Sequence, residues 1–210
     1  MNGSFAMTDQ PTIILVPGLR NSGPGHWQTL WEERRGDCIR AQLGDWDQPH
    51  RNAWVSNLGL AIRQSVQLSG QPVVLAAHSL GCHTVAWWAQ LEPEAAALVR
   101  GALLVAPPEV DFFPLDDRLS SFAPTVSQPL PFPAFLVGSR NDPYMGLHAA
   151  HQLARRWGAR FVDLGLRGHI NADSKLGDWP LGQALLDELR GADQAEASPA
   201  ERQGLGNAHH

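Results

Sequence analysis

A serine at a predicted strand-to-helix junction is the residue of this chain best suited to nucleophilic chemistry. Ser79 lies in the segment Ala77-His78-Ser79-Leu80-Gly81, directly after an aliphatic run and directly before an apolar pattern typical of a helix. Such a junction holds a serine in a strained conformation that exposes its hydroxyl, and it needs small residues two positions before and two after. Ala77 and Gly81 meet this requirement, with alanine in place of the more usual glycine. The alternative is that Ser79 only caps the helix, as serine often does.

A serine hydroxyl becomes a good nucleophile only when a base removes its proton and an acid orients that base. Asp142 and His169 follow Ser79 in the chain order serine, acid, histidine that is used by hydrolases with doubly wound sheets. Each comes shortly after an expected strand. Taken singly, Asp142 could belong to a turn and His169 to the surface, and Asp111, after another expected strand, is a second candidate for the acid. We expect Ser79, Asp142 and His169 to form the catalytic set.

Acyl transfer also requires backbone N–H groups that bind the developing oxyanion. Leu80, which follows the nucleophile, and Leu19, which follows the turn Pro17-Gly18, occupy the expected positions for this oxyanion hole. The loop from Gly18 to Gly25 has the glycine interval of a phosphate-binding loop, but Pro24-Gly25 stands where a lysine and a hydroxyl residue would be needed. We therefore expect neither a nucleotide nor any other cofactor.

The remaining histidines and the two cysteines give no metal or disulfide pattern. His148 and His151 lie about one helical turn apart, but no third ligand is evident, so they fit a solvated helix face. His78 is expected to point away from the nucleophile and to pack or make a local hydrogen bond. Cys38 and Cys82 lack CxxC spacing, which favours a reducing compartment and argues against a structural zinc site.

The composition is that of an ordinary globular protein. Of 210 residues, 43% are apolar and 18% are charged, and the net charge of -5 provides no electrostatic basis for binding nucleic acid. Residues 1–11 contain neither a basic nor an apolar stretch, and no apolar run approaches the roughly 18 to 20 residues of a membrane-spanning helix. We expect a cytoplasmic protein that binds neither nucleic acid nor membrane and acts on a small-molecule ester or amide. Its oligomeric state stays open.

Short aliphatic runs alternate along the chain with helical patterns, and these elements must position the side chains described above. Strands are expected at 12–16, 38–42, 73–77, 101–106, 134–137 and 161–164, of which 38–42 is the weakest. Helical periodicity covers 54–62, 80–91, 144–157 and 181–189. The alternation predicts βαβ crossovers and therefore a single three-layer α/β/α domain, residues 12–190, with a mostly parallel six-stranded sheet. Residues 1–11 and 191–210 are expected to be disordered tails.

The proline-rich stretch from Pro107 to Pro133 is the one insertion able to cover the site, and a short helix is expected near 116–122. A cap of this size cannot enclose a long acyl channel. A shallow apolar rim is expected from six aromatic residues, unless they close the core instead: Trp27, Phe112, Phe113, Phe122, Phe132 and Tyr144. We therefore expect acetyl to butyryl esters to be better substrates than long-chain esters.

Together these motifs resemble the α/β-hydrolases, and within them the small serine hydrolases typified by the retinoblastoma-binding serine hydrolase and its bacterial YdeN-like relatives. The resemblance covers about residues 12–190, and its most specific part is Asp45-Trp46-Asp47-Gln48-Pro49 followed by Trp54, which looks like the family's Trp-Asp-x-Pro segment. It implies an α/β-hydrolase fold with a minimal cap, and hydrolysis of esters or small amides with the three residues above as nucleophile, acid and base. Retinoblastoma binding does not carry over, because Leu-x-Cys-x-Glu is absent. The alternatives are a serine peptidase or amidase acting on small aminoacyl substrates, and a catalytically silent binding protein.

Overall fold

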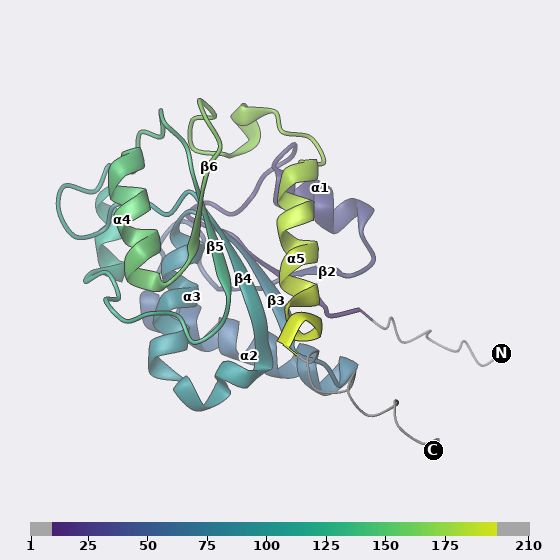
Figure 1. The fold of residues 1–210 in the computed structure, drawn as a ribbon. Coiled ribbons are helices and arrows are strands. Elements are labelled where there is room, and N and C mark those ends of the chain that lie inside the picture. The colour runs from purple at the N-terminus through teal and green to yellow at the C-terminus, as the bar shows by residue number, and fades with distance from the viewer. Residues whose placement is uncertain (1–9, 197–210) are drawn as a thin grey trace, which may run out of the picture.

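Six parallel strands form one sheet at the centre of the computed structural model, which describes residues 10–196 (Figure 1). The strand order is β2-β1-β3-β4-β5-β6, and every neighbouring pair is parallel. The strands are β1 (Ile13–Val16), β2 (Cys38–Arg40), β3 (Val73–His78), β4 (Val99–Val105), β5 (Ala134–Gly138) and β6 (Arg160–Asp163). The expected parallel α/β architecture is therefore confirmed.

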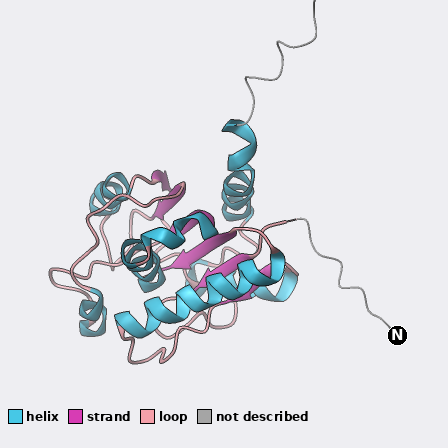
Figure 2. Ribbon diagram, turned by 90° about the horizontal axis from the view of Figure 1, so that it is seen from below, coloured by secondary structure: helices cyan, strands magenta, loops and turns pink. Residues whose placement is uncertain are grey.

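Helices cover both faces of this sheet and complete the three layers (Figures 1 and 2). Helices α2 (Arg51–Ser69), α3 (Leu80–Leu91) and α4 (Leu147–Trp157) pack on one face, while α1 (Trp27–Arg34) and α5 (Pro180–Glu196) pack on the other. Short 3-10 helices are η1 (Pro93–Leu98), η2 (Asp117–Phe122) and η3 (Ala172–Ser174). Within residues 10–196, none of the helices combines the length and the apolar character needed to cross a membrane.

Strand β1 shows why the central strands appear in the sequence as continuous apolar runs. Its side chains alternate between the two layers of core, with Ile14 and Val16 packed among α2 and α3 and with Ile13 and Leu15 packed against α1 and α5. All four are completely buried. Because both faces are covered by helices, no position on this strand favours a polar residue.

Several elements differ in existence or length from the sequence-based expectation, among them α1, β2 and α5. Helix α1 was not predicted, because its buried apolar anchors are only Trp27 and Trp31, and apart from the half-buried Leu30 its other residues are polar. Strand β2 ends at Arg40 and not at residue 42. Helix α5 continues to Glu196, beyond the expected domain end at residue 190. Of the two expected tails, residues 1–9 and 197–210 lie outside the described residues.

The proline-rich stretch between β4 and β5 packs as part of the domain. It contains η2, close to the expected short helix, and Leu119 and Phe122 of η2 are buried in the core between the sheet and helices α2 to α4. Two indole groups from α3 and α4 also hold this stretch in place. Trp87 Nε1 donates to Phe122 O (2.9 Å), and Trp157 Nε1 donates to Val126 O (2.9 Å). The cap is thus small and firmly attached.

Candidate active site

The expected site residues all follow the carboxyl ends of parallel strands, which meet at one edge of the sheet. Leu19 follows β1, Ser79 follows β3, Asp142 follows β5, and His169 lies on the loop after β6. Ligands of open α/β sheets bind at this edge, outside the strand ends. Chain order and sheet topology together bring residues 90 positions apart in sequence into direct contact.

The backbone at Ser79 has the strained geometry that its position requires. Its φ is 54° and its ψ is -125°, a conformation that costs a residue other than glycine about 1–3 kcal/mol. The Ser79 N–H donates to Val105 O of the neighbouring strand at 2.8 Å, which helps to hold this turn. The Ser79 hydroxyl makes no capping hydrogen bond to α3, so it does not act as the helix cap that was the alternative interpretation.

Two glycines allow the strand-to-helix turn to pack against the end of β1. A Cβ atom on Gly81 would lie 2.2 Å from Val16 O, closer than any side chain tolerates. A Cβ atom on Gly18 would lie 2.8 Å from Ser79 Cβ and 3.1 Å from Leu80 N. The small residues around the serine are therefore required by the close approach of two backbone segments.

The side chains of Ser79, His169 and Asp142 form a continuous hydrogen-bonded series. Ser79 Oγ lies 2.9 Å from His169 Nε2, and His169 Nδ1 lies 3.0 Å from both carboxylate oxygens of Asp142. The side chains of His169 and Asp142 are only 10% and 3% exposed. A carboxylate can only accept a hydrogen bond, so the His169 proton resides on Nδ1 and the Nε2 lone pair faces the serine hydroxyl.

Hydrogen bonds between two loops fix the positions of Asp142 and His169 relative to each other. Asn141 Oδ1 accepts from Gly168 N (2.8 Å), and Ser139 Oγ accepts from Arg167 N (2.9 Å). Asp142 Oδ1 also accepts from Tyr144 N at 2.9 Å, which fixes the orientation of its carboxylate. The loop after β5 is therefore bound directly to the loop that carries His169.

Asp111, the second candidate for the acid, has a different partner. Its Oδ1 accepts from Thr125 N at 2.7 Å, a bond within the proline-rich cap. The structure therefore brings Asp142, and not Asp111, to His169.

The other histidines considered from the sequence also have ordinary partners. His148 Nε2 lies 2.8 Å from Gln152 Nε2 on the same exposed helix face, and the ring of His151 lies 5.0 Å from that of Phe161. Across residues 10–196, no cluster of three or more histidine, cysteine or acidic side chains is arranged to hold a metal ion.

The amides expected to bind an oxyanion lie beside the serine. Leu80 is the first residue of α3, where backbone N–H groups have no partner within the helix and carry the positive end of its dipole. Leu19 lines the same pocket as Ser79 and His169. Its loop is held by hydrogen bonds from Arg20 N to Trp46 O (2.8 Å) and from Asn21 N to Gly18 O (3.0 Å). The Trp46 segment, singled out by its resemblance, thus supports this loop.

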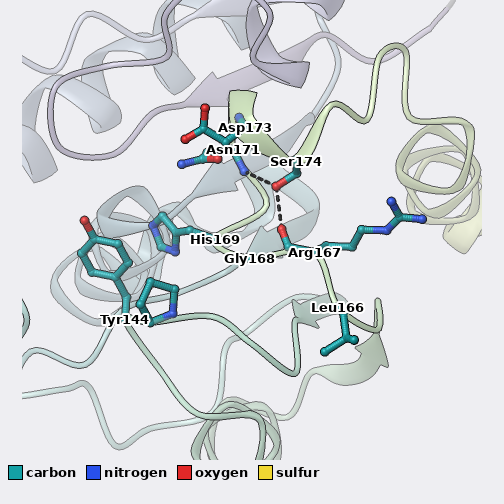
Figure 3. A pocket seen from close by; sticks show the side chains of 9 residues that line it. Tyr144, Leu166, Arg167, Gly168, His169, Asn171, Asp173 and Ser174 are labelled. Carbon is teal, nitrogen blue, oxygen red and sulfur yellow. Dashed lines mark hydrogen bonds between the residues drawn. The ribbon is translucent and has the colours of Figure 1, made fainter.

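The pocket above Ser79 is small and partly polar. It has a volume of about 140 Å³, and besides Leu19, Ser79 and His169 its walls come from the following residues: Arg20, Asn21, His26, His78, Asp116, Leu119, Tyr144 and Asn171. A larger hollow of about 430 Å³ adjoins it and shares Tyr144, His169 and Asn171 (Figure 3). The ring of Tyr144 packs against that of His169, with centroids 4.2 Å apart, at the boundary between the two.

The expected aromatic rim is largely wrong. Of its six members, only Tyr144 lines the pocket at Ser79. Trp27, Phe122 and Phe132 are buried in the core, which was the alternative interpretation, while the adjacent Phe112 and Phe113 are 75% and 98% exposed on the cap. The composition of the cap could not distinguish these outcomes, because each depends on the path of the loop.

Two buried histidines lie beside Ser79 and His169 in this pocket. His78 was expected to point away from the nucleophile and to pack or make a local hydrogen bond. This expectation is wrong, because His78 lines the pocket at Ser79 and its Nε2 lies 2.9 Å from His169 O, 91 positions along the chain. His26, at the start of α1, was not singled out from the sequence, and its Nε2 lies 3.3 Å from His78 Nδ1. A lone histidine in a glycine-rich loop gives no signal of such a contact.

Comparison with known proteins identifies the family. A family model described as serine hydrolase matches residues 13–188. The chain belongs to this serine hydrolase family. A YdeN-like hydrolase from Pectobacterium atrosepticum has 34% sequence identity to it and a TM-score of 0.74, with 89% of this chain and 94% of that chain covered. These two matches confirm the resemblance to YdeN-like serine hydrolases that was drawn from the sequence.

More distant structures share the fold of this serine hydrolase. The YdeN gene product of B. subtilis is 18% identical, with a TM-score of 0.65 and coverage of 85% of this chain and 98% of that chain. Est1E from Butyrivibrio proteoclasticus, solved with ferulic acid bound, is 14% identical, with a TM-score of 0.65 and coverage of 85% and 89%. No curated protein matches the chain.

Proposed function

We propose that this serine hydrolase cleaves small carboxylic esters through an acyl-enzyme intermediate on Ser79. The observation that carries the proposal is the 2.9 Å contact between Ser79 Oγ and His169 Nε2, with the other ring nitrogen of His169 bound to both oxygens of Asp142. This arrangement supplies an activated nucleophile, a base with its lone pair directed at that nucleophile, and an acid that fixes the tautomer.

The proposed reaction begins when Ser79 Oγ attacks the ester carbonyl carbon and His169 Nε2 takes the hydroxyl proton. The N–H groups of Leu19 and Leu80 bind the oxygen that becomes negative, and Asp142 stabilises the imidazolium. His169 then gives its proton to the departing alkoxide. In the second half, His169 removes a proton from water, which attacks the acyl carbon. The bond from that carbon to Ser79 Oγ then breaks, His169 gives the proton back to Oγ, and the acid is released.

The sizes of the two hollows support small acyl groups. The space over Ser79, about 140 Å³, lies below the roughly 300–1,000 Å³ of ordinary ligand pockets. The adjoining hollow is larger, and its lining includes the polar side chains of Asn171 and Asp173. Because His169 lines both and protonates the leaving group, we assign the acyl group to the first and a polar alcohol to the second.

A fluorophosphonate probe tests the nucleophile. We expect it to label Ser79, and Ser79→Ala to lose both labelling and turnover, because only an activated serine reacts with such a probe at a useful rate. Ser65→Ala, which removes a hydroxyl bonded within α2, is the matched control and should behave as wild type. Normal turnover by a folded Ser79→Ala protein would exclude this mechanism, and absence of labelling in the wild type would favour the silent binding protein.

Acyl length and leaving group test the substrate class. We expect kcat/KM to be highest for acetyl to butyryl esters and to fall by about ten carbons, because a small pocket cannot bury the added methylenes that are otherwise worth ~0.8 kcal/mol each. A steady rise from two to twelve carbons would refute the small acyl site. Aminoacyl amides, assayed in parallel, decide the alternative: comparable kcat/KM on amides would make the protein a peptidase or amidase.

We also propose that the protein acts in the cytoplasm. Cys38 and Cys82 are both buried free thiols. Burial raises the pKa of Cys38 to about 12, which leaves it as an unreactive thiol at neutral pH. Two unpaired cysteines fit a reducing compartment. That the protein binds neither nucleic acid nor membrane stays a prediction from its charge and composition.

A further inference from the structure

Two buried histidines connect the start of helix α1 to the loop that carries His169. His26 and His78 are only 4% and 5% exposed. Gln28 N lies 3.1 Å from His26 Nδ1, His26 Nε2 lies 3.3 Å from His78 Nδ1, and His78 Nε2 lies 2.9 Å from His169 O. The result is an unbroken series of three hydrogen bonds that ends on the backbone of the proposed base.

The direction of these hydrogen bonds is determined independently from both ends. At one end, the carbonyl oxygen of His169 can only accept, so His78 Nε2 carries a proton and His78 Nδ1 is left as an acceptor. At the other end, the N–H of Gln28 can only donate, so His26 Nδ1 accepts and His26 Nε2 carries the proton. Both conclusions require His26 Nε2 to donate to His78 Nδ1. Each ring is therefore a neutral imidazole in one tautomer.

The surroundings of the two rings also favour the neutral state. Burial, the Arg40 guanidinium and the nearby ring of His169 lower the pKa of His26 to about 3. Burial, together with His26 and His169, also keeps the pKa of His78 well below its usual value. Neither ring therefore competes with His169 for a proton at neutral pH.

The first histidine is itself fixed to the sheet. Gln28 Nε2 donates to Ala76 O of strand β3 at 2.9 Å, and this bond ties the start of α1 to the strand that ends at His78. From the same turn, Trp27 Nε1 donates to Ile170 O at 3.1 Å. Two successive carbonyl groups of the histidine loop, at residues 169 and 170, are thus held by side chains that β3 and α1 provide.

The histidine loop needs this support because part of it is strained. Ile170 has φ 51°, a left-handed conformation that is unfavourable for a β-branched residue and persists only where neighbours enforce it. Without its carbonyl partners, the backbone next to His169 would relax. The ring of His169 would then move relative to Ser79 and Asp142.

We propose that His26 and His78 are positioning residues that hold the backbone of His169, and thereby its imidazole, in line between Asp142 and Ser79. This inference rests on the proposed function. Both histidines also line the pocket over Ser79, but their ring nitrogens are used within the series, so they act through His169 and need not touch the substrate.

Substitutions that differ by one hydrogen bond test the proposal. His78→Gln keeps a donor at nearly the reach of Nε2, whereas His78→Asn is equally polar but too short to reach His169 O. We expect His78→Asn to lower kcat about 10- to 100-fold with KM changed less than about threefold, since a displacement of about 1 Å at a catalytic group can cost 10²-fold. His78→Gln keeps the bond to His169 O but offers no acceptor to His26 Nε2, so it should lose at most about tenfold in kcat and clearly less than His78→Asn.

A second variant approaches the series from α1. His26→Asn keeps the helix cap, because asparagine is a preferred N-cap residue, but its side chain cannot reach His78. We expect a loss of kcat of about tenfold, again with little change in KM. Should His78→Asn fail to fold, His26→Asn alone decides the question by the same criterion.

Proton NMR provides a readout that a merely structural role would not move. The imidazole proton shared by His169 and Asp142 should give a far-downfield resonance in wild type and His78→Gln, and it should broaden or disappear in folded His78→Asn. Equal kcat for His78→Asn and His78→Gln, or an unchanged resonance in His78→Asn, would overturn the inference while leaving the hydrolase in place. An active Ser79→Ala protein would instead overturn both the proposed function and the inference.

Discussion

Replacement of Asp142 by asparagine should disable the base while leaving the fold intact. The Tyr144 N–H donates to Asp142 Oδ1 at 2.9 Å, and an asparagine would keep its carbonyl oxygen on that donor. Its NH2 group would then face His169 Nδ1, which lies 3.0 Å from both carboxylate oxygens. To accept this hydrogen bond, His169 must place its proton on Nε2. The nitrogen 2.9 Å from Ser79 Oγ would then carry a proton and could not act as the base.

The expected loss follows from this change of tautomer. A triad with the wrong histidine tautomer loses about 10⁴-fold in kcat, which corresponds to about 5 kcal/mol of transition-state stabilisation. The assay is kcat on a soluble acetyl ester, together with thermal unfolding to show that the variant is folded. Asp111→Asn is the matched control, because an amide oxygen can still accept from Thr125 N, and it should stay within about twofold of wild type in kcat. A loss below tenfold for Asp142→Asn, or a greater loss for Asp111→Asn, would refute the reasoning.

Two further predictions concern stability and are measured by urea unfolding. Gly81→Ala should lower the free energy of unfolding by about 3 kcal/mol or more, because its Cβ would lie 2.2 Å from a carbonyl oxygen of β1. Gly36→Ala is the control and should have little effect, because its Cβ would have no neighbour within 4 Å. Equal losses of stability in the two variants would contradict the packing argument. Burial raises the pKa of Asp37, but hydrogen bonds from Arg35 and Arg190 outweigh it and lower that pKa to about 2. Because the folded pKa lies below the ordinary 3.8, this stabilisation is complete above about pH 4 and is lost as pH falls through 2. Asp37→Asn should therefore cost about 1 kcal/mol at pH 7, after allowance for solvent screening, and almost nothing near pH 2, so an equal cost at both pH values would argue against the ion pairs.

Local sequence features were sufficient to predict the sheet and the serine junction. Four of the six strands, β1, β3, β4 and β5, are runs of mainly aliphatic residues, because helices cover both faces of the sheet and leave few positions that favour a polar side chain. The turn at Ser79 was readable because its constraint is steric and local: a strained serine flanked by Ala77 and Gly81. Helix α1 was missed because its burial depends on two tryptophans, a number too small to produce a clear helical periodicity.

Contacts between loops were decided only by the tertiary structure. Asp111 and Asp142 both follow strands, and no local sequence feature tells which of them contacts the histidine. Hydrogen bonds from the histidine loop to Ser139 and Asn141 bring Asp142 to His169. Asp111 instead accepts a hydrogen bond inside the cap. The same holds for the aromatic residues of the cap, since the path of a proline-rich loop sets whether each ring reaches the core, the pocket or solvent. The contact between His26 and His78 joins residues 52 positions apart. Local residue patterns contain no information about such a distance, because it depends on how α1 packs against the end of β3.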